Sequence, residues 1–128
     1  MRDETKIWIN YSKENLESAE ILLESKLFNP CLQNIQQCIE KALKSVLIEK
    51  SIELKRTHSI SELKNILFQN GIQIEITEED CEFLDSIYLP SKYPIGNVLA
   101  HYEPDMAICK KGITIAKEIF YNIQKMFE

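Results

Sequence analysis

The segment 91–102, which reads SKYPIGNVLAHY, contains side chains that can do chemistry. His101 is one of the 2 histidines in the chain, and an imidazole can bind a phosphate or move a proton because its charge changes near neutral pH. Its polar and aromatic neighbours are Lys92, Tyr93, Asn97 and Tyr102. A lysine can hold an anion, and a tyrosine can stack on a base or pack the segment down. A histidine can equally cap a backbone carbonyl or face solvent, so the residues alone leave both readings open.

Further cations precede this segment in the sequence. A basic strip can form from Lys41, Lys44, Lys50, Lys55 and Arg56. This strip either attracts an anion or is a solvated face whose charge Glu40, Glu49 and Glu53 offset. Three glutamines, Gln33, Gln36 and Gln37, can line a cleft between two copies of the chain or face water. The second histidine, His58, precedes a predicted helix, and we expect it to bond to a neighbouring helix as a structural residue.

The composition bounds the class of protein. A net charge of −5 and a pI of about 5.1 argue against a protein that coats nucleic acid, but they permit a local basic cleft. No CxxC pair occurs among Cys31, Cys38, Cys81 and Cys109, and neither histidine has a second ligand at metal spacing. We therefore expect buried thiols in a reducing compartment, and neither a metal nor a cofactor.

Neither a membrane span nor an export signal is expected. No apolar run approaches the roughly 20 residues that cross a bilayer. The N-terminal MRDETKIW lacks the apolar core of a signal peptide. We expect a cytoplasmic protein without a membrane partner, and a length of 128 residues suits one domain over residues 1–128.

Apolar residues at three- and four-residue steps predict the elements that position these side chains. The first helix covers 5–25, with a stripe of Trp8, Tyr11, Leu16, Ala19, Leu22 and Leu23. The second runs from about Pro30 to Lys50, with Ile35, Ile39, Ala42, Leu43, Val46 and Leu47 inward and the glutamines, Glu40, Lys41 and Lys44 on other faces. The third begins near Ser59, where Ser59 and Glu62 can form a capping box, and ends at Asn70-Gly71.

Two more helices complete the chain. Residues 72–76 alternate in polarity but have no partner strand, so we expect an extended connector. The fourth helix covers 77–88, and the fifth runs from Asp105 to the C-terminus. Between them we expect a long loop, of the kind that is often functional in a compact domain. The pattern predicts an all-α antiparallel bundle of about five helices.

Three stretches together resemble the HEPN domain family. The segment 31–47, CLQNIQQCIEKALKSVL, resembles the family's QQA-x-EKALKA-type second helix. The segment 56–63, RTHSISEL, resembles the Thr-His opening of its third helix, and 88–94, YLPSKYP, is similar to the proline loop of one prokaryotic subgroup. The three occur in order at fitting distances, so the resemblance covers nearly the whole chain.

The resemblance implies a helical bundle that dimerises and pairs with a minimal nucleotidyltransferase in a toxin–antitoxin or defence module. It also implies a test for metal-independent ribonuclease activity, which in this family uses Arg-x4–6-His, often as Arg-Asn-x-x-x-His. Asn97 and His101 match that pattern, but Gly96 stands where the arginine is expected. A glycine cannot stabilise the charge of a phosphorane as a bidentate arginine does. Lys92 can supply a point charge but not the fork.

We therefore expect a homodimeric binding module that holds a nucleotide or RNA phosphate, or a cognate nucleotidyltransferase, without cutting RNA. Its ligand-binding residues would be Lys92, Tyr93, Asn97, His101, Tyr102, Lys41 and Lys44. The alternative is a metal-independent ribonuclease toxin, in which His101 is catalytic and Lys92 or Lys44 replaces the missing arginine. Whether the protein is an enzyme stays open at this point.

Overall fold

The computed structural model describes residues 1–92 and 104–128 and contains five helices in these ranges. They are α1 (Asp3–Glu24), α2 (Phe28–Glu49), α3 (Ile60–Gln69), α4 (Glu78–Lys92) and α5 (Met106–Met126). The prediction of an all-α bundle of about five helices is confirmed. The segment 72–76 is a connector between α3 and α4, as expected.

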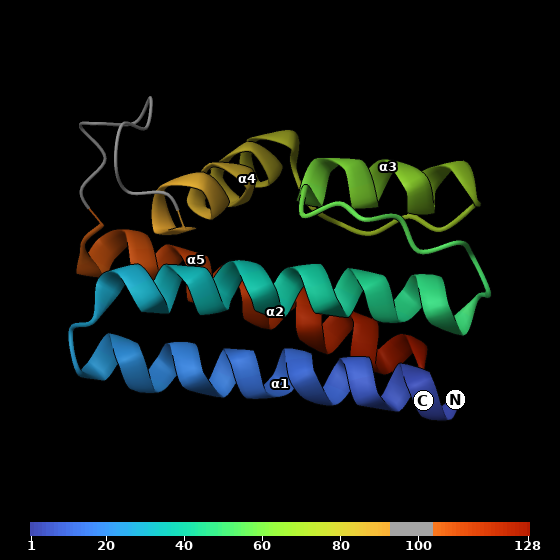
Figure 1. Cartoon of the computed structure of the whole chain (residues 1–128), viewed down its shortest axis with the longest axis horizontal. Helices are drawn as coiled ribbons and strands as arrows, with labels where there is room; N and C mark the ends of the chain where they lie inside the picture. The colour runs from blue at the N-terminus through green and yellow to red at the C-terminus, as the bar shows by residue number, and fades with distance from the viewer. Residues whose placement is uncertain (93–103) are drawn as a thin grey trace.

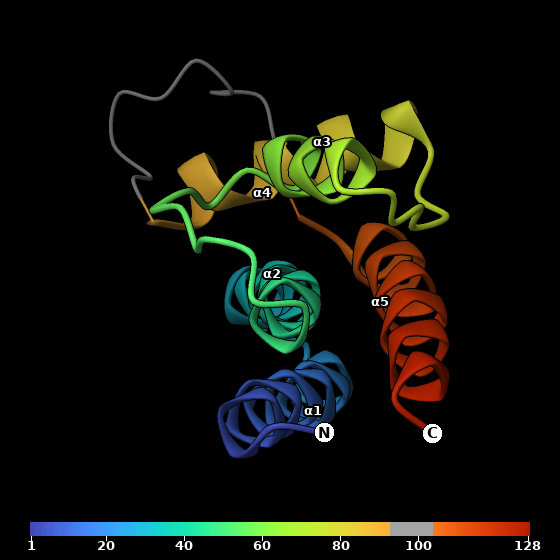
Figure 2. The ribbon, with the colours of Figure 1, turned by 90° about the vertical axis from the view of Figure 1, so that its right-hand side faces the viewer.

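The central helix of the bundle is α2, which packs against each of the other four helices. Figure 1 shows α1 and α2 running antiparallel side by side, with α5 behind them and α3 and α4 above. Turned by 90°, the view in Figure 2 shows α2 enclosed between α1, α5 and the α3–α4 layer. This position explains why the apolar residues of α2 at the predicted inward positions are fully buried: Ile35, Ile39, Ala42, Leu43, Val46 and Leu47.

The connection from α2 to α3 decides what lies beside the middle of α2. Figure 1 shows this connection turning back along α2 before α3 begins. It starts from a left-handed turn at Ser51, with φ of 56°, where the amide of Ile52 donates to the carbonyl of Leu47 and ends α2. The returning segment brings His58 back beside the buried Glu40 of α2.

The predicted helix ends are confirmed by their hydrogen bonds. The Ser59 hydroxyl accepts from the amide of Glu62 at the start of α3, and the Asp105 carboxylate accepts from the amide of Ile108 at the start of α5. Gly71 has a φ of +80°, a left-handed conformation that glycine adopts without strain, and it follows the last turn of α3. The capping box is half formed, because the Ser59 amide donates to Thr57 Oγ1 rather than to Glu62.

Two sequence-based expectations about the helices are wrong in part. On α1, the predicted Leu16 and Ala19 are buried, and Leu22 and Leu23 pack against the core. The stripe on α1 is formed by Thr5, Ile9, Ser12, Leu16 and Ala19, while Tyr11 is exposed and Trp8 half-buried. The apolar pattern missed Thr5 and Ser12 because small hydroxyl side chains can be buried when they have a partner, and the Ser12 hydroxyl donates to the carbonyl of Cys38 at 2.6 Å.

The second difference concerns the end of α4. The helix continues through Pro90 to Lys92 instead of ending at about Tyr88. The expected end rested on Pro90, because proline lacks the amide that would bond the carbonyl four residues earlier and its ring crowds that carbonyl. The predicted loop 90–102 therefore overlaps the last three helical positions. In the described ranges no helix is long and apolar enough to cross a membrane.

Candidate functional site

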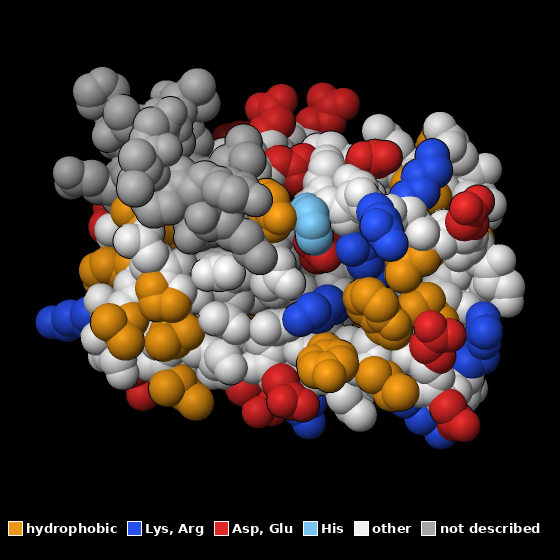
Figure 3. All heavy atoms as spheres, viewed as in Figure 1, with side chains coloured by type: hydrophobic (Ala, Val, Ile, Leu, Met, Phe, Trp, Pro, Cys, Tyr) orange, Lys and Arg blue, Asp and Glu red, His pale blue; other side chains and the backbone are white. Residues whose placement is uncertain are grey.

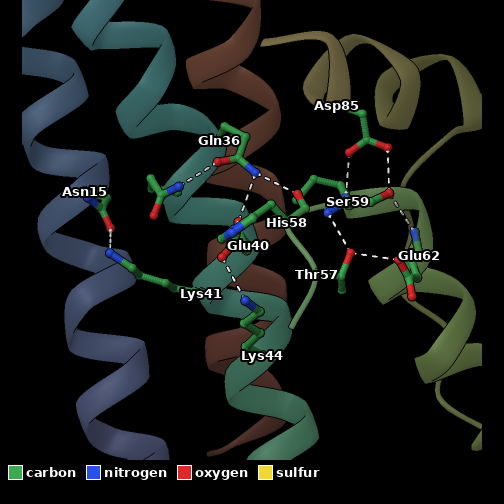
Figure 4. A network of polar contacts seen from close by, with 12 residues as sticks. Asn15, Gln36, Glu40, Lys41, Lys44, Thr57, His58, Ser59, Glu62 and Asp85 are labelled. Carbon is green, nitrogen blue, oxygen red and sulfur yellow. Dashed lines mark hydrogen bonds and ion pairs between the residues drawn. The ribbon is translucent and has the colours of Figure 1, made fainter. Parts of the chain in front are cut away.

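A buried polar ladder on α2 forms the centre of the candidate site. Gln36, Glu40 and Lys44 follow one another at four-residue steps, and their exposed fractions are 1%, 4% and 7%. The Lys44 ammonium lies 2.9 Å from Glu40 Oε2, and Gln36 Nε2 donates to Glu40 Oε1 at 3.1 Å (Figure 4). The expectation that all three occupy faces away from the core is wrong, since the connection to α3 covers this face of α2.

His58 joins this ladder from outside. Its Nδ1 atom lies 3.0 Å from Glu40 Oε1, and its backbone carbonyl accepts from Gln36 Nε2 at 3.0 Å. The prediction that His58 bonds to a neighbouring helix is confirmed. Its ring stacks on Tyr88 of α4, with a centroid distance of 4.6 Å and an interplanar angle of 14°. The side chain is nevertheless 51% exposed, so the ring is positioned from inside and remains accessible from outside.

The ionisation of Glu40 follows from its contacts. Burial raises the pKa of this carboxyl, but hydrogen bonds and charge from Lys44, together with hydrogen bonds from Gln36 and His58, lower the pKa below its ordinary value overall. Glu40 is therefore a carboxylate at neutral pH and can only accept hydrogen bonds. It follows that Nδ1 of His58 carries the hydrogen of this bond and donates it to Glu40.

Asp85 of α4 fixes the segment that carries His58. Its carboxylate accepts from the amide of Ile60 at 2.6 Å, from the hydroxyl of Ser59 at 3.0 Å and from the hydroxyl of Ser61 at 2.8 Å. A carboxylate at a helix N-terminus satisfies free amides and suits the helix dipole. Asp85 therefore anchors the start of α3 to α4 directly beside the histidine.

A groove between α1 and α2 adjoins the polar ladder, and we call it the α1–α2 groove. It is lined by Ile7, Trp8, Tyr11 and Lys41 and has a volume of about 290 Å³. The Lys41 ammonium lies 5.2 Å from the Tyr11 ring centroid, and the Lys44 ammonium lies 6.0 Å from the Trp8 ring. Figure 3 shows a histidine, Lys or Arg side chains and hydrophobic side chains next to one another on this face.

The structure describes only part of the predicted site. Lys41 and Lys44 lie on the face just described, but Lys44 is paired and buried rather than part of a solvated strip. Lys92 is the last residue of α4, and its side chain is outside the described part. Four predicted site residues, Tyr93, Asn97, His101 and Tyr102, also lie outside the described residues.

Several residues of this face were missed by reading the sequence. The four-residue spacing of Gln36, Glu40 and Lys44 was a signal for one shared face, but it does not reveal that the face is covered. Asp85 and Asn15 gave no signal, because each acts on an element distant in sequence.

The thiols form no part of this site. Cys31, Cys38, Cys81 and Cys109 are free and buried, as predicted. Burial raises the pKa of Cys31 to about 12 and that of Cys38 to about 11. Within residues 1–92 and 104–128, no group of three His, Cys, Asp or Glu side chains is arranged to hold a metal ion.

The five-helix bundle, with a histidine held against the second helix at the start of the third, defines a class of small helical domains. The chain belongs to the HEPN domain family, whose model matches residues 5–126. A relative from Methanocaldococcus jannaschii, named "Putative toxin MJ1304", is 28% identical, and the alignment covers 94% of this chain and 88% of the relative.

Two solved structures resemble the fold. The first, ST0689, is described as an archaeal HEPN homologue and matches with a TM-score of 0.72 and 26% identity over 100% of both chains. The second, TT1696 from Thermus thermophilus, matches with a TM-score of 0.76 over 97% of this chain and 98% of that one. Its identity is 21%, so it supports the fold alone.

Proposed function

We propose that the protein is the HEPN member of a toxin–antitoxin or defence pair and acts as a non-catalytic binding module. It holds the phosphate of a nucleotide or RNA, or a cognate nucleotidyltransferase, on the face that carries His58 and Lys41. The relative from M. jannaschii supports the toxin–antitoxin role, since its name describes a toxin. The segment 93–102, with Tyr93, Asn97, His101 and Tyr102, contributes to the same binding site in this proposal, as does Lys92.

One observation carries the non-catalytic part of the proposal. The candidate replacements for the missing arginine are Lys92 and Lys44, and of these two the structure describes the side chain of Lys44. The Lys44 ammonium lies 2.9 Å from the buried Glu40 carboxylate. A cation neutralised by a buried carboxylate stabilises a phosphorane poorly, because the new anion must compete with an existing ion pair. With Gly96 at the arginine position, this pairing argues against Lys44 as the substitute for the missing arginine.

The experiment is incubation of the purified chain with RNA in EDTA. The proposal expects intact RNA together with measurable binding of a nucleotide or short RNA at low salt. A Lys92→Ala variant should bind more weakly and a Lys50→Ala variant equally well, since Lys50 is an exposed lysine at the end of α2. Cleavage of RNA by the wild type that is lost in His101→Ala would overturn the non-catalytic assignment.

The second candidate function is a metal-independent ribonuclease. A specific observation favours it: His58 has the geometry of a proton-transfer residue, with Nδ1 on an ionised carboxylate and half of the side chain exposed. His101 with Lys92 is the pair expected from the family motif. Cleavage lost in His58→Ala but retained in His101→Ala would assign the activity to the described face, and the reverse result would assign it to the 93–102 segment.

The partners are part of the same proposal. We propose a homodimer, motivated by exposed apolar side chains on α1 and α5 outside the α1–α2 groove, among them Ile21, Tyr121 and Met126. Light scattering at micromolar concentration checks this, and a monomer mass would contradict it. The second partner is checked by whether a small nucleotidyltransferase gene lies beside this one and whether its product co-elutes with this chain in size-exclusion chromatography after co-expression.

A further inference from the structure

In the α1–α2 groove, the Lys41 ammonium forms no ion pair with an acidic side chain of the described residues. This ammonium donates to Asn15 Oδ1 at 3.0 Å and lies over the Tyr11 ring. The ion pairs between described residues are Lys44–Glu40, His58–Glu40 and Lys117–Glu20, and none of them includes Lys41. In an acidic protein, an uncompensated lysine next to an open groove attracts an anion locally.

A chain of amides holds this lysine in place. Asn15 Nδ2 donates to Asn34 Oδ1 at 3.0 Å, and Asn34 Nδ2 donates to the carbonyl of Pro30 at 2.9 Å. These two bonds fix the Asn15 amide so that its oxygen points to Lys41, a contact that Figure 4 shows. Because the ammonium is already ordered, less side-chain entropy is lost when an anion binds to it.

The remaining walls of the groove are apolar and aromatic. Tyr11 is 54% and Ile7 56% exposed, while Trp8 is half-buried, with the Lys44 ammonium 6.0 Å from the centroid of its ring. Aromatic faces stack on any nucleobase, and such stacking does not depend on the base sequence. An aromatic wall beside a fixed cation fits a ligand that is planar at one end and anionic at the other.

We propose that the α1–α2 groove binds a nucleotide unit, with its base against Trp8 and Tyr11 and its phosphate on Lys41. This inference rests on the proposed function for the class of ligand and extends it by naming the stacking residues and the phosphate-binding lysine. The nucleotide unit comes either as a free mononucleotide or within a single strand of RNA, and the two sources are separated by experiment.

The chain has 1 tryptophan, so its fluorescence reports on the groove. The full chain is titrated at low salt with adenosine 5′-monophosphate, adenosine, inorganic phosphate and a short oligoadenylate. The monophosphate should quench Trp8 saturably, adenosine should bind about tenfold more weakly, and phosphate should compete without quenching. Oligoadenylate that binds much more tightly than the monophosphate identifies RNA as the source, and equal affinity identifies the free nucleotide.

Matched variants separate the lysine from general effects. Lys41→Gln should weaken the monophosphate about tenfold. Asn15→Asp should weaken it similarly while keeping the lysine, because the new carboxylate would neutralise Lys41. Lys50→Gln, at the C-cap of the same helix, should bind as the wild type does. Thermal melts followed by circular dichroism check that each variant is folded.

Three outcomes would overturn the inference. No saturable Trp8 quenching, or equal affinity in wild type, Lys41→Gln and Asn15→Asp, would remove the proposed site. A Tyr11→Asp variant that becomes monomeric with unchanged nucleotide affinity would assign the groove to a second copy of the chain.

Equilibrium dialysis distinguishes this inference from the proposed function. Nucleotide that is retained without a Trp8 signal overturns this inference alone, and no retention overturns nucleotide binding as a function as well.

Discussion

The Nδ1 atom of His58 lies 3.0 Å from Oε1 of Glu40, so an exposed imidazole is held by a buried carboxylate. The carboxylate also binds the Lys44 ammonium and the Gln36 amide. A buried ionised group is tolerated only where partners replace the water that it loses. The histidine therefore depends on a network that the core of the bundle holds in place, and changes to that network should alter both stability and the position of the ring.

The Glu40–Lys44 pair should show strong coupling. We expect Lys44→Met to destabilise the protein by about 3 kcal/mol, since it removes the strongest partner of a buried carboxylate. The sequence alone predicts that Lys44→Ala does not prevent folding, because Lys44 lies off the apolar stripe. Since the structure shows Lys44 buried, we expect its replacement to cost more free energy of unfolding than the sequence suggests. The double variant Glu40→Leu/Lys44→Met should lose less than the sum of the single changes. Urea unfolding of the four proteins measures this, and additive losses would contradict it.

The pH dependence of stability should reveal the same carboxylate. The pKa of Glu40 in the folded protein lies below its ordinary value of 4.5, so its contribution to stability is present above that value and is lost as the pH falls through the folded pKa. The melting temperature should therefore fall steeply below about pH 4.5, and in Glu40→Gln it should fall less steeply with pH.

Glu49 limits how much of the pH dependence of the melting temperature is removed by Glu40→Gln. Its pKa is also lowered, first by the Arg2 amide and then by the Thr5 hydroxyl, so it adds its own loss of stability in acid. The exposed Glu53 provides the control, and Glu53→Gln should melt with the wild-type slope. An unchanged slope in Glu40→Gln would show that Glu40 is not the group responsible.

Most of the fold could be predicted because it depends on local signals. The three- and four-residue apolar steps, Ser59, Asp105 and Gly71 each act within a few residues of their own position, and the helices begin and end close to where these signals indicate. The burial of Lys44 could not be predicted in this way. Lys44 pairs with Glu40 and lies near Trp8 of α1, and the return of the α2–α3 connection places His58 on the same carboxylate. These contacts depend on the chain path, which no residue near Lys44 encodes.

The candidate site shows the same division between local and distant contacts. The bond of His58 to a neighbouring helix was predicted from its place before α3, but its partner Glu40 was counted among solvated charges. Asn15 and Asp85 were missed because their partners, Lys41 and the start of α3, are distant in sequence. The apolar pattern predicted Trp8 and Tyr11 on the buried stripe of the first helix. In the structure Tyr11 is exposed and Trp8 is half-buried, and both line the α1–α2 groove.

Asp85 should contribute to stability as a cap supplied by another helix. We expect Asp85→Ala to cost about 2 kcal/mol, because it leaves the amide of Ile60 and the hydroxyls of Ser59 and Ser61 without their acceptor. Glu82→Ala, an exposed acidic position on the same helix, is the matched control and should cost little. Chemical denaturation measures both. Equal effects of the two changes would mean that the cap is not specific.

Charges placed in the core should prevent folding. Leu43 is fully buried at the centre of α2, and Phe120 of α5 is 2% exposed. Either Leu43→Asp or Phe120→Asp buries an unpaired carboxylate, at a cost of several kcal/mol by the order of magnitude for such groups, which is comparable to the whole stability of a domain of this size. Circular dichroism should show loss of the helical signal. A native melting curve for either variant would mean that the helix faces are assigned wrongly.

The cysteines should be unreactive as long as the protein is folded. A thiol reacts as its thiolate, and burial raises the pKa of Cys31 to about 12 and of Cys38 to about 11, while the pKa values of Cys81 and Cys109 are also raised by burial. At about pH 8, an ordinary exposed thiol is partly ionised, but these four have neither the charge nor the exposure to react. Ellman's reagent should therefore detect no thiol in the native protein at this pH and all 4 after unfolding in denaturant.

The rate of thiol labelling should follow the opening of the fold. Lys44→Met, which we expect to destabilise the bundle, should therefore be labelled faster than the wild type. Rapid labelling of one thiol in the native wild type would show that one of these side chains is open to solvent.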